Sequence, residues 1–148
     1  MLTLLTCILS TPVSAAAEGQ PVELTGRVRC LEAEASAADP ADHPCNAIGA
    51  RFMFDTADGR QVSLLDDDPK AGAFLDPVVR SRALLLRGWE RGIDGFEILS
   101  VFSVLDGRKH HVHYRCDVCD ITASGPGPCW CCGADFERRE VAVDTHEE

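Results

Sequence analysis

Two closely spaced pairs of cysteines near the C-terminus restrict the fold of this chain more than any other feature of its sequence. The pairs are Cys116 with Cys119 and Cys129 with Cys132, each in a C-x-x-C arrangement, with nine residues between them. Two such pairs supply the four thiolates of a tetrahedral metal site, because each pair closes a tight turn around the ion and a hairpin brings the two turns together. The segment GPGP at 125–128 provides that turn. The sequence therefore predicts a four-cysteine metal site.

The residues beside the two pairs agree with this geometry. Gly133 follows the second pair and suits the positive φ that such a turn needs, and Asp120 follows the first pair and is one of the few other residue types that tolerate it. A fifth thiol, Cys131, lies inside the second pair. We expect Cys131 to be solvent-accessible and not a ligand. It is an additional candidate ligand only if the second pair is shifted in register.

Three uses of these cysteines are consistent with the sequence. A metal site is favoured, because a disulfide between residues three apart is strained unless it is a redox pair. Disulfides among the cysteines are the alternative in an oxidising compartment. A thioredoxin-type thiol pair would need a βαβ setting, which the sequence does not supply. We expect zinc, with iron or copper as alternatives, since iron also accepts four thiolates and copper also binds soft ligands.

The segments CDVC, PGPC and CCGADFERRE resemble a rubredoxin-like zinc ribbon and the C-terminus of small exported bacterial proteins that have no assigned activity. The resemblance implies a metal knuckle and no known activity. We therefore assign 107–140 to a zinc-ribbon-like unit and 141–148 to an acidic tail.

The first seventeen residues have the composition of an export signal. They contain no charged side chain, and three alanines at 15–17 precede Glu18, where charged residues begin. The apolar run is too short and too interrupted to span a bilayer. We predict a signal peptide at 1–17, a mature chain that begins near Glu18, and export to the periplasm or the extracellular space, with no transmembrane segment after cleavage. An apolar N-terminal strand or a retained anchor helix is the alternative.

The chain after residue 20 has the pattern of short strands. Alternating apolar positions predict a long strand at 22–30 that is bent at Gly26. The Asp-Gly dipeptide at 58–59 predicts a hairpin between two short strands. Two more strands are expected at 82–90 and 95–105, joined by a tight turn.

One short, irregular helix is expected between the third and fourth strands. Pro69 suits its first turn, Pro77 kinks or ends it, and the acidic run at 66–68 caps it. This order resembles the OB-fold, which implies a mainly β, five-stranded OB-like β-barrel over residues 18–106. The side chains expected in its core are Val22, Leu24, Val28, Phe52, Leu64, Leu84, Leu86, Ile98 and Val101.

Charge argues against the nucleic-acid binding for which many such barrels are used. The chain has 24 acidic and 14 basic residues, a formal net charge of −10, and would repel a polyanion. We expect no nucleic-acid partner.

Two further pairs of side chains lie outside the cysteine cluster. Cys30 and Cys45 are expected to form a disulfide that holds the loop between them, with a buried free thiol at Cys30 as the alternative. His111 and His113 point to one face of a strand, a spacing that can chelate Cu²⁺, Ni²⁺ or Zn²⁺, and they are a candidate additional metal site. A polar strand face with exposed imidazoles is the alternative.

Two classes of function follow from these features. The first is an exported, non-catalytic binding module with a structural metal site, whose partner is a protein or a small ligand. The second is a periplasmic metal-handling or electron-transfer protein that uses the cysteine and histidine side chains. The sequence offers no nucleophile with a base and no carboxylate pair, so an enzyme is the less favoured interpretation.

Overall fold

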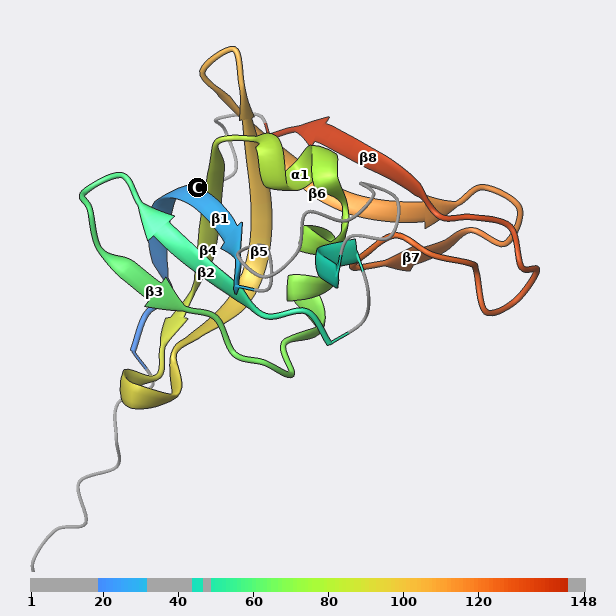
Figure 1. Cartoon of the computed structure of the whole chain (residues 1–148). Helices are drawn as coiled ribbons and strands as arrows, with labels where there is room; N and C mark the ends of the chain where they lie inside the picture. Colours follow the sequence, from blue (N-terminus) through green and yellow to red (C-terminus); the bar gives the residue numbers. More distant parts are fainter. Residues whose placement is uncertain (1–18, 32–43, 47–48, 144–148) are drawn as a thin grey trace, which may run out of the picture.

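A computed structural model describes residues 19–31, 44–46 and 49–143 of the chain, so the predicted leader and the end of the acidic tail lie outside the described residues. The fold is mainly β, an open antiparallel sheet with a few short helical segments (Figure 1). Its strands are β1 (Val22–Cys30), β2 (Phe52–Thr56), β3 (Gln61–Ser63), β4 (Leu84–Glu90), β5 (Phe96–Leu105), β6 (Arg108–Cys116), β7 (Ile121–Ala123) and β8 (Glu137–Ala142).

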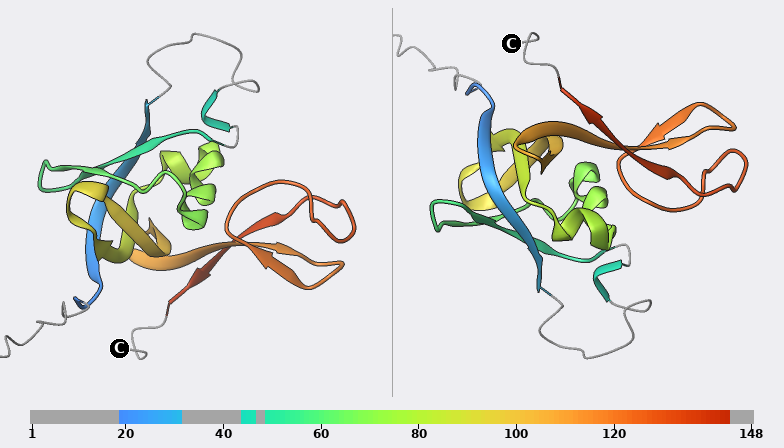
Figure 2. Two further views of the ribbon diagram at one scale, coloured as in Figure 1. Left: turned by 90° about the horizontal axis from the view of Figure 1, so that it is seen from below. Right: turned by 90° about the horizontal axis from the view of Figure 1, so that it is seen from above.

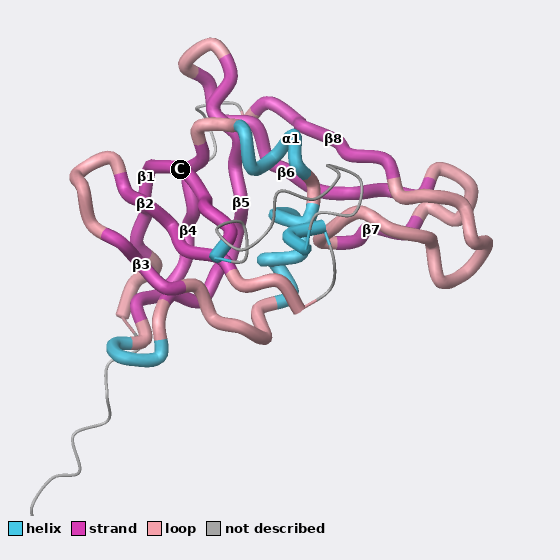
Figure 3. The backbone as a smooth tube through the Cα atoms, in the orientation of Figure 1, coloured by secondary structure: helices cyan, strands magenta, loops and turns pink. Residues whose placement is uncertain are grey.

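The strands follow the order β3-β2-β1-β4-β5-β6-β7 across the sheet, and β8 pairs with β6. The helical segments are η3 (Pro44–Asn46), η4 (Pro69–Leu75), α1 (Pro77–Ser81) and η5 (Gly92–Asp94). Strand and loop make up most of the chain (Figure 3). No helix among the described residues is both long enough and apolar enough to cross a membrane.

β1 changes its strand partner at Gly26, where the sequence predicts a bend. Its first half pairs with β4 and its second half pairs with β2, and Gly26 lies in both registers, opposite Leu84 and Thr56. A Cβ at Gly26 would lie 2.1 Å from the carbonyl oxygen of Asp55. Only glycine therefore allows the crossing strands to approach this closely.

The prediction of a five-stranded barrel was wrong in two respects. The sheet has eight strands, and it does not close into a barrel. The five expected strands are present, but the Asp106-Gly107 turn, with φ of 50° and 73°, leads from β5 directly into β6. The sheet thus continues past the predicted boundary between 106 and 107. Leu64, the residue after the three-residue strand β3, forms one parallel bridge with Phe96 of β5.

The expected single helix is instead two segments with Asp76 between them. Asp76 ends η4, and its carboxylate accepts a hydrogen bond from the Val78 N–H (2.8 Å) to cap α1, so Pro77 starts a helix and does not kink one. The prediction that the acidic run caps the helical segment is confirmed for Asp68. Its carboxylate accepts hydrogen bonds from the N–H groups of Lys70 and Ile98.

Eight of the nine predicted core side chains are buried, and Val22 is the exception at 41% exposed. Val22 pairs with Gly88, which has no side chain to cover it. The core also extends beyond the predicted barrel, since Tyr114, Cys116, Cys129 and Phe136 belong to the same buried cluster. Figure 2 shows η4 and α1 between strands β1–β5 and the extension formed by β6–β8.

Cys30 and Cys45 form the expected disulfide, with Cα atoms 6.0 Å apart. The bond joins the end of β1 to η3, and both cysteines are buried. Most of the loop that it closes lies outside the described residues.

Candidate metal centre

The four predicted ligand cysteines lie on two turns that repeat the same backbone hydrogen bond. Cys116 ends β6, and its carbonyl accepts a hydrogen bond from the Asp120 N–H (2.8 Å). The Cys129 carbonyl accepts one from the Gly133 N–H, also at 2.8 Å. Asp120 and Gly133 have φ of 57° and 76°, the positive values that the sequence predicts for the residue after each pair. Both turns therefore have the backbone conformation expected of metal-binding knuckles, and we use this name for them below.

The second knuckle lies at the tip of a hairpin that continues into β8. Pro128 bridges Asp135, the Cys129 N–H donates to Ala134, and the Phe136 N–H donates to Gly127 (2.8 Å). β8 then pairs with β6 from His110 to Arg115. The hairpin thus returns the chain to the strand that carries the first knuckle.

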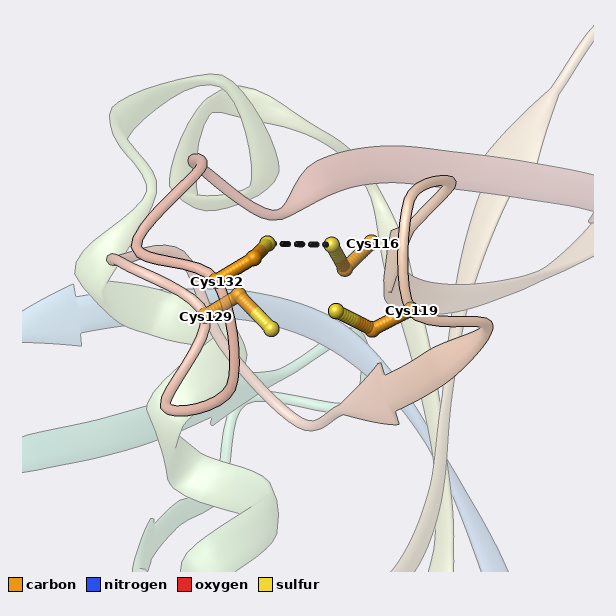
Figure 4. A group of neighbouring side chains, drawn as sticks. All are labelled: Cys116, Cys119, Cys129 and Cys132. Carbon is orange, nitrogen blue, oxygen red and sulfur yellow. Dashed lines mark hydrogen bonds between the residues drawn. The ribbon is translucent and has the colours of Figure 1, made fainter.

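The four sulfur atoms converge. All lie within 4.8 Å of one another, and the Cys116 and Cys132 sulfurs are 3.5 Å apart. Figure 4 shows the two pairs facing each other across the space between the knuckles. Four sulfurs about 2.3 Å from a tetrahedral zinc ion would be about 3.8 Å apart, so the cluster needs little rearrangement to hold one ion.

The ligand thiols differ in exposure. Cys116 and Cys129 are 1% and 2% exposed and pack in the core, whereas Cys119 is half-buried and Cys132 is exposed. The cluster therefore has a buried side and an edge that is open to solvent.

Backbone N–H groups of the second knuckle favour a thiolate at Cys129. Those of Cys132 and Cys131 form hydrogen bonds with its sulfur and lower its pKa to about 7. The neighbouring thiols of Cys131 and Cys132 act in the opposite direction on Cys119 and raise its pKa above the ordinary value. A bound cation would favour the thiolate form at all of these positions.

The extension carrying the knuckles is fixed to the helical segments by a buried polar contact that sequence reasoning missed. The Tyr114 hydroxyl donates to the Asp76 carboxylate (3.0 Å), and the Arg138 guanidinium donates to the same oxygen (2.6 Å). Burial raises the pKa of Tyr114, which keeps its hydroxyl protonated. Although burial opposes it, the hydrogen bond from Arg138 holds the pKa of Asp76 below its ordinary value.

A second attachment is a close backbone approach between Gly72 in η4 and Gly125 in the loop after β7. A Cβ at Gly125 would lie 2.5 Å from the Gly72 carbonyl oxygen, whereas a Cβ at Gly72 would be 3.7 Å from its nearest neighbour, an ordinary contact. The GPGP segment therefore has a packing role beyond the turn that the sequence predicts.

The predicted histidine pair lies on one face of β6. The rings of His111 and His113 stack, with centroids 5.6 Å apart, and Phe102 contacts His111 edge-on at 5.4 Å. Burial, followed by the neighbouring His113, lowers the pKa of His111. Within the part of the chain that the structure describes, the four cysteines are the only group of three or more metal-ligand side chains that converge. A metal site at the histidines remains a prediction.

Cys131 is exposed, as the sequence predicts, and its thiol is not one of the four that converge. Its role as an additional ligand is left as a prediction.

No protein-family model, curated protein or solved structure matches this chain. The four cysteines, which could hold a metal ion, are the feature of the structure that bears most directly on function.

Proposed function

We propose that this chain is an exported, non-catalytic binding module whose C-terminal ribbon is folded around one structural Zn²⁺ ion. The observation that carries the proposal is the convergence of four thiols from two equivalent knuckles. Zinc suits such a site, because four thiolates in a tetrahedron satisfy it without any redox change. The four ligands also close the coordination sphere, which leaves no open position for a substrate.

The rest of the fold supports an OB-like body for the module. Three features support a partly open, OB-like arrangement: the strand order β3-β2-β1-β4-β5, the helical segments between β3 and β4, and the Leu64–Phe96 bridge. A hollow of about 330 Å³, lined in part by Leu65, Trp89 and Leu99, offers a surface for a protein or small ligand.

Export is the remaining part of the proposal. The Cys30–Cys45 disulfide is compatible with an oxidising compartment. The uncharged leader at 1–17 is the sequence feature that supports export.

The test is elemental analysis of the full chain, purified from its native compartment, together with a thiol count under native and denaturing conditions. One zinc per chain, with four thiols that react only after denaturation or chelation, is the expected result. Copper, or the visible absorption of iron bound to thiolates, would favour metal handling or electron transfer instead. Absence of metal, with a single free thiol among the five cysteines at 116–132, would show that the other four form disulfides.

A matched pair of variants tests the ligand register. Cys129→Ser should abolish tight zinc binding and unfold the ribbon, because binding free energy at a structural site is largely folding free energy. Cys131→Ser should keep one zinc per chain. The reverse pattern would show that the second pair is shifted.

A further inference from the structure

Two hollows adjoin at the segment that joins β3 to η4 (Figure 1). The first is the hollow of about 330 Å³ described above, and the second has a volume of about 360 Å³. Asp67, Asp68 and Pro69 line both hollows, and we call the two together the 67–69 groove. The apolar part of its lining includes Trp89, Ile98 and Leu99 in the first hollow and Phe52, Ala71 and Leu75 in the second.

Leu99 lines the groove because of a β-bulge in β5. Its neighbours Ile98 and Ser100 are opposite Gly88 and Arg87 of β4, and Leu99 has no partner between them. Leu99 is 39% exposed, although Ile98 beside it is buried in the core. A bulge of this kind re-aims a side chain, and here it leaves a large apolar group at the first hollow.

The charges that line the groove favour a cation. Four acidic side chains and one basic side chain line the two hollows, a formal net charge of −3. Asp68 is engaged by two backbone N–H groups, and Glu97 is paired with Arg91. The exposed carboxylate of Asp67 forms no hydrogen bond or ion pair within the part of the chain that the structure describes. The net charge of −10 on the whole chain also attracts a cationic partner over a longer range.

We propose that the 67–69 groove docks an extended, basic segment of another protein, with an apolar side chain in each hollow and a Lys or Arg side chain beside Asp67. The inference rests on the proposed role as a binding module and names the chemistry of its partner. Alternate residues of an extended segment point to one face, so the basic residue lies two positions from each apolar one. A chain segment suits the groove better than a small compact ligand, which would fill one hollow and leave the other open.

The probe is a displayed library of random seven-residue peptides, selected on the full-length chain as purified. A synthetic peptide with the selected consensus is then titrated against the wild type and two matched pairs of variants by fluorescence anisotropy. Asp67→Asn removes the charge shared by the two hollows, and Asp106→Asn removes one from the β5–β6 turn, at the opposite end of the molecule in Figure 1. Leu99→Ser removes apolar lining, and Val141→Ser makes a comparable change at a 54% exposed position of β8.

We expect the selected peptides to carry Lys or Arg with an apolar residue two positions away on each side. Asp67→Asn should weaken binding of the consensus peptide about fivefold and Leu99→Ser about tenfold, while both controls stay within about twofold of the wild type. The charge-reversed variant Asp67→Lys should lose this peptide and bind a version with Glu in place of the basic residue. Misfolding cannot produce such a gain.

Selection of peptides that lack a basic residue, or of none, would overturn the proposal. Equal weakening in the control variants would also overturn it, because binding would then depend on net charge or stability and not on the groove. Zinc content is measured on every protein, which separates this inference from the proposed metal site. A chain that binds zinc but no basic peptide refutes the docking surface alone, and one that binds the peptide without zinc refutes the metal site alone.

Discussion

Gly125 provides a test of how β6–β8, the extension that carries the four cysteines, is attached to the rest of the fold. A Cβ at this position would lie 2.5 Å and 2.7 Å from the carbonyl oxygen and carbon of Gly72, which are backbone atoms that cannot rotate away. Ordinary contacts begin near 3.4 Å, so Gly125→Ala requires the loop to move away from η4 by about 1 Å. Gly125 is not among the residues with positive φ, so alanine itself is not strained there.

The matched control is Gly72→Ala, the same substitution on the other side of the contact. Its Cβ would be 3.7 Å from the nearest atoms of Gly125, and Gly72 also lacks a positive φ. Gly72→Ala should be neutral or stabilise the fold by up to about 1 kcal/mol, because it reduces the freedom of the unfolded chain. Gly125→Ala should destabilise the fold by about 1–3 kcal/mol through overpacking.

The assay is urea unfolding of the zinc-loaded proteins, followed by circular dichroism and by tryptophan fluorescence. Trp130 lies in the second knuckle and packs against Phe136 (ring centroids 5.1 Å apart), so the fluorescence includes a signal from the extension. The destabilised variant should also melt lower by about 2–4 °C for each kcal/mol lost. Equal stability of the two alanine variants would refute the argument, since the contact would then not be as close as its geometry indicates.

Three further predictions concern the polar attachment and the leader. Tyr114→Phe removes the hydroxyl that donates to Asp76 and should lower the free energy of unfolding by about 1–2 kcal/mol, measured by urea denaturation; an unchanged value would show that Arg138 alone satisfies the carboxylate. Because the folded-state pKa of Asp76 is lowered, its contribution to stability is present above the ordinary aspartate pKa and is lost as the pH falls through the lowered value. As the pH falls below about 4, the free energy of unfolding should therefore decrease less for Asp76→Asn than for the wild type. The difference between the two proteins is compared at each pH, because acid removes metal from both alike. Parallel pH profiles would contradict the prediction. Mass spectrometry of exported protein should find a mature chain that begins near Glu18, and an intact N-terminus would reject the signal peptide.

The knuckles could be predicted from sequence because their requirements are local. The spacing of Cys116 and Cys119, and of the second pair, fixes each turn, and the residue after each pair must accept a positive φ. The strand at 22–30 could also be predicted from sequence, because its buried residues Leu24, Val28 and Cys30 alternate with more exposed positions along the chain.

β8 could not be predicted in the same way. Its sequence, ERREVA, has no apolar alternation, and its strand conformation depends on hydrogen bonding to β6 after the second knuckle has turned the chain. The contact between Asp76 and Arg138 joins residues 62 positions apart, and nothing in the spacing of either indicates the other. These features depend on tertiary pairing, which a pattern along the chain does not contain.

If the proposed metal site is correct, the position of β8 has a consequence for handling the metal-free protein. β8 covers one edge of β6 from His110 to Arg115, while β5 and β7 share the other edge. If loss of the ion loosens the second knuckle, β8 loses the link that returns it to this place, and the N–H and C=O groups along the uncovered edge of β6 become available to a strand from another chain. The chelated protein should therefore self-associate through β6 at high concentration, and metal supplied during refolding would act against aggregation as well as against unfolding.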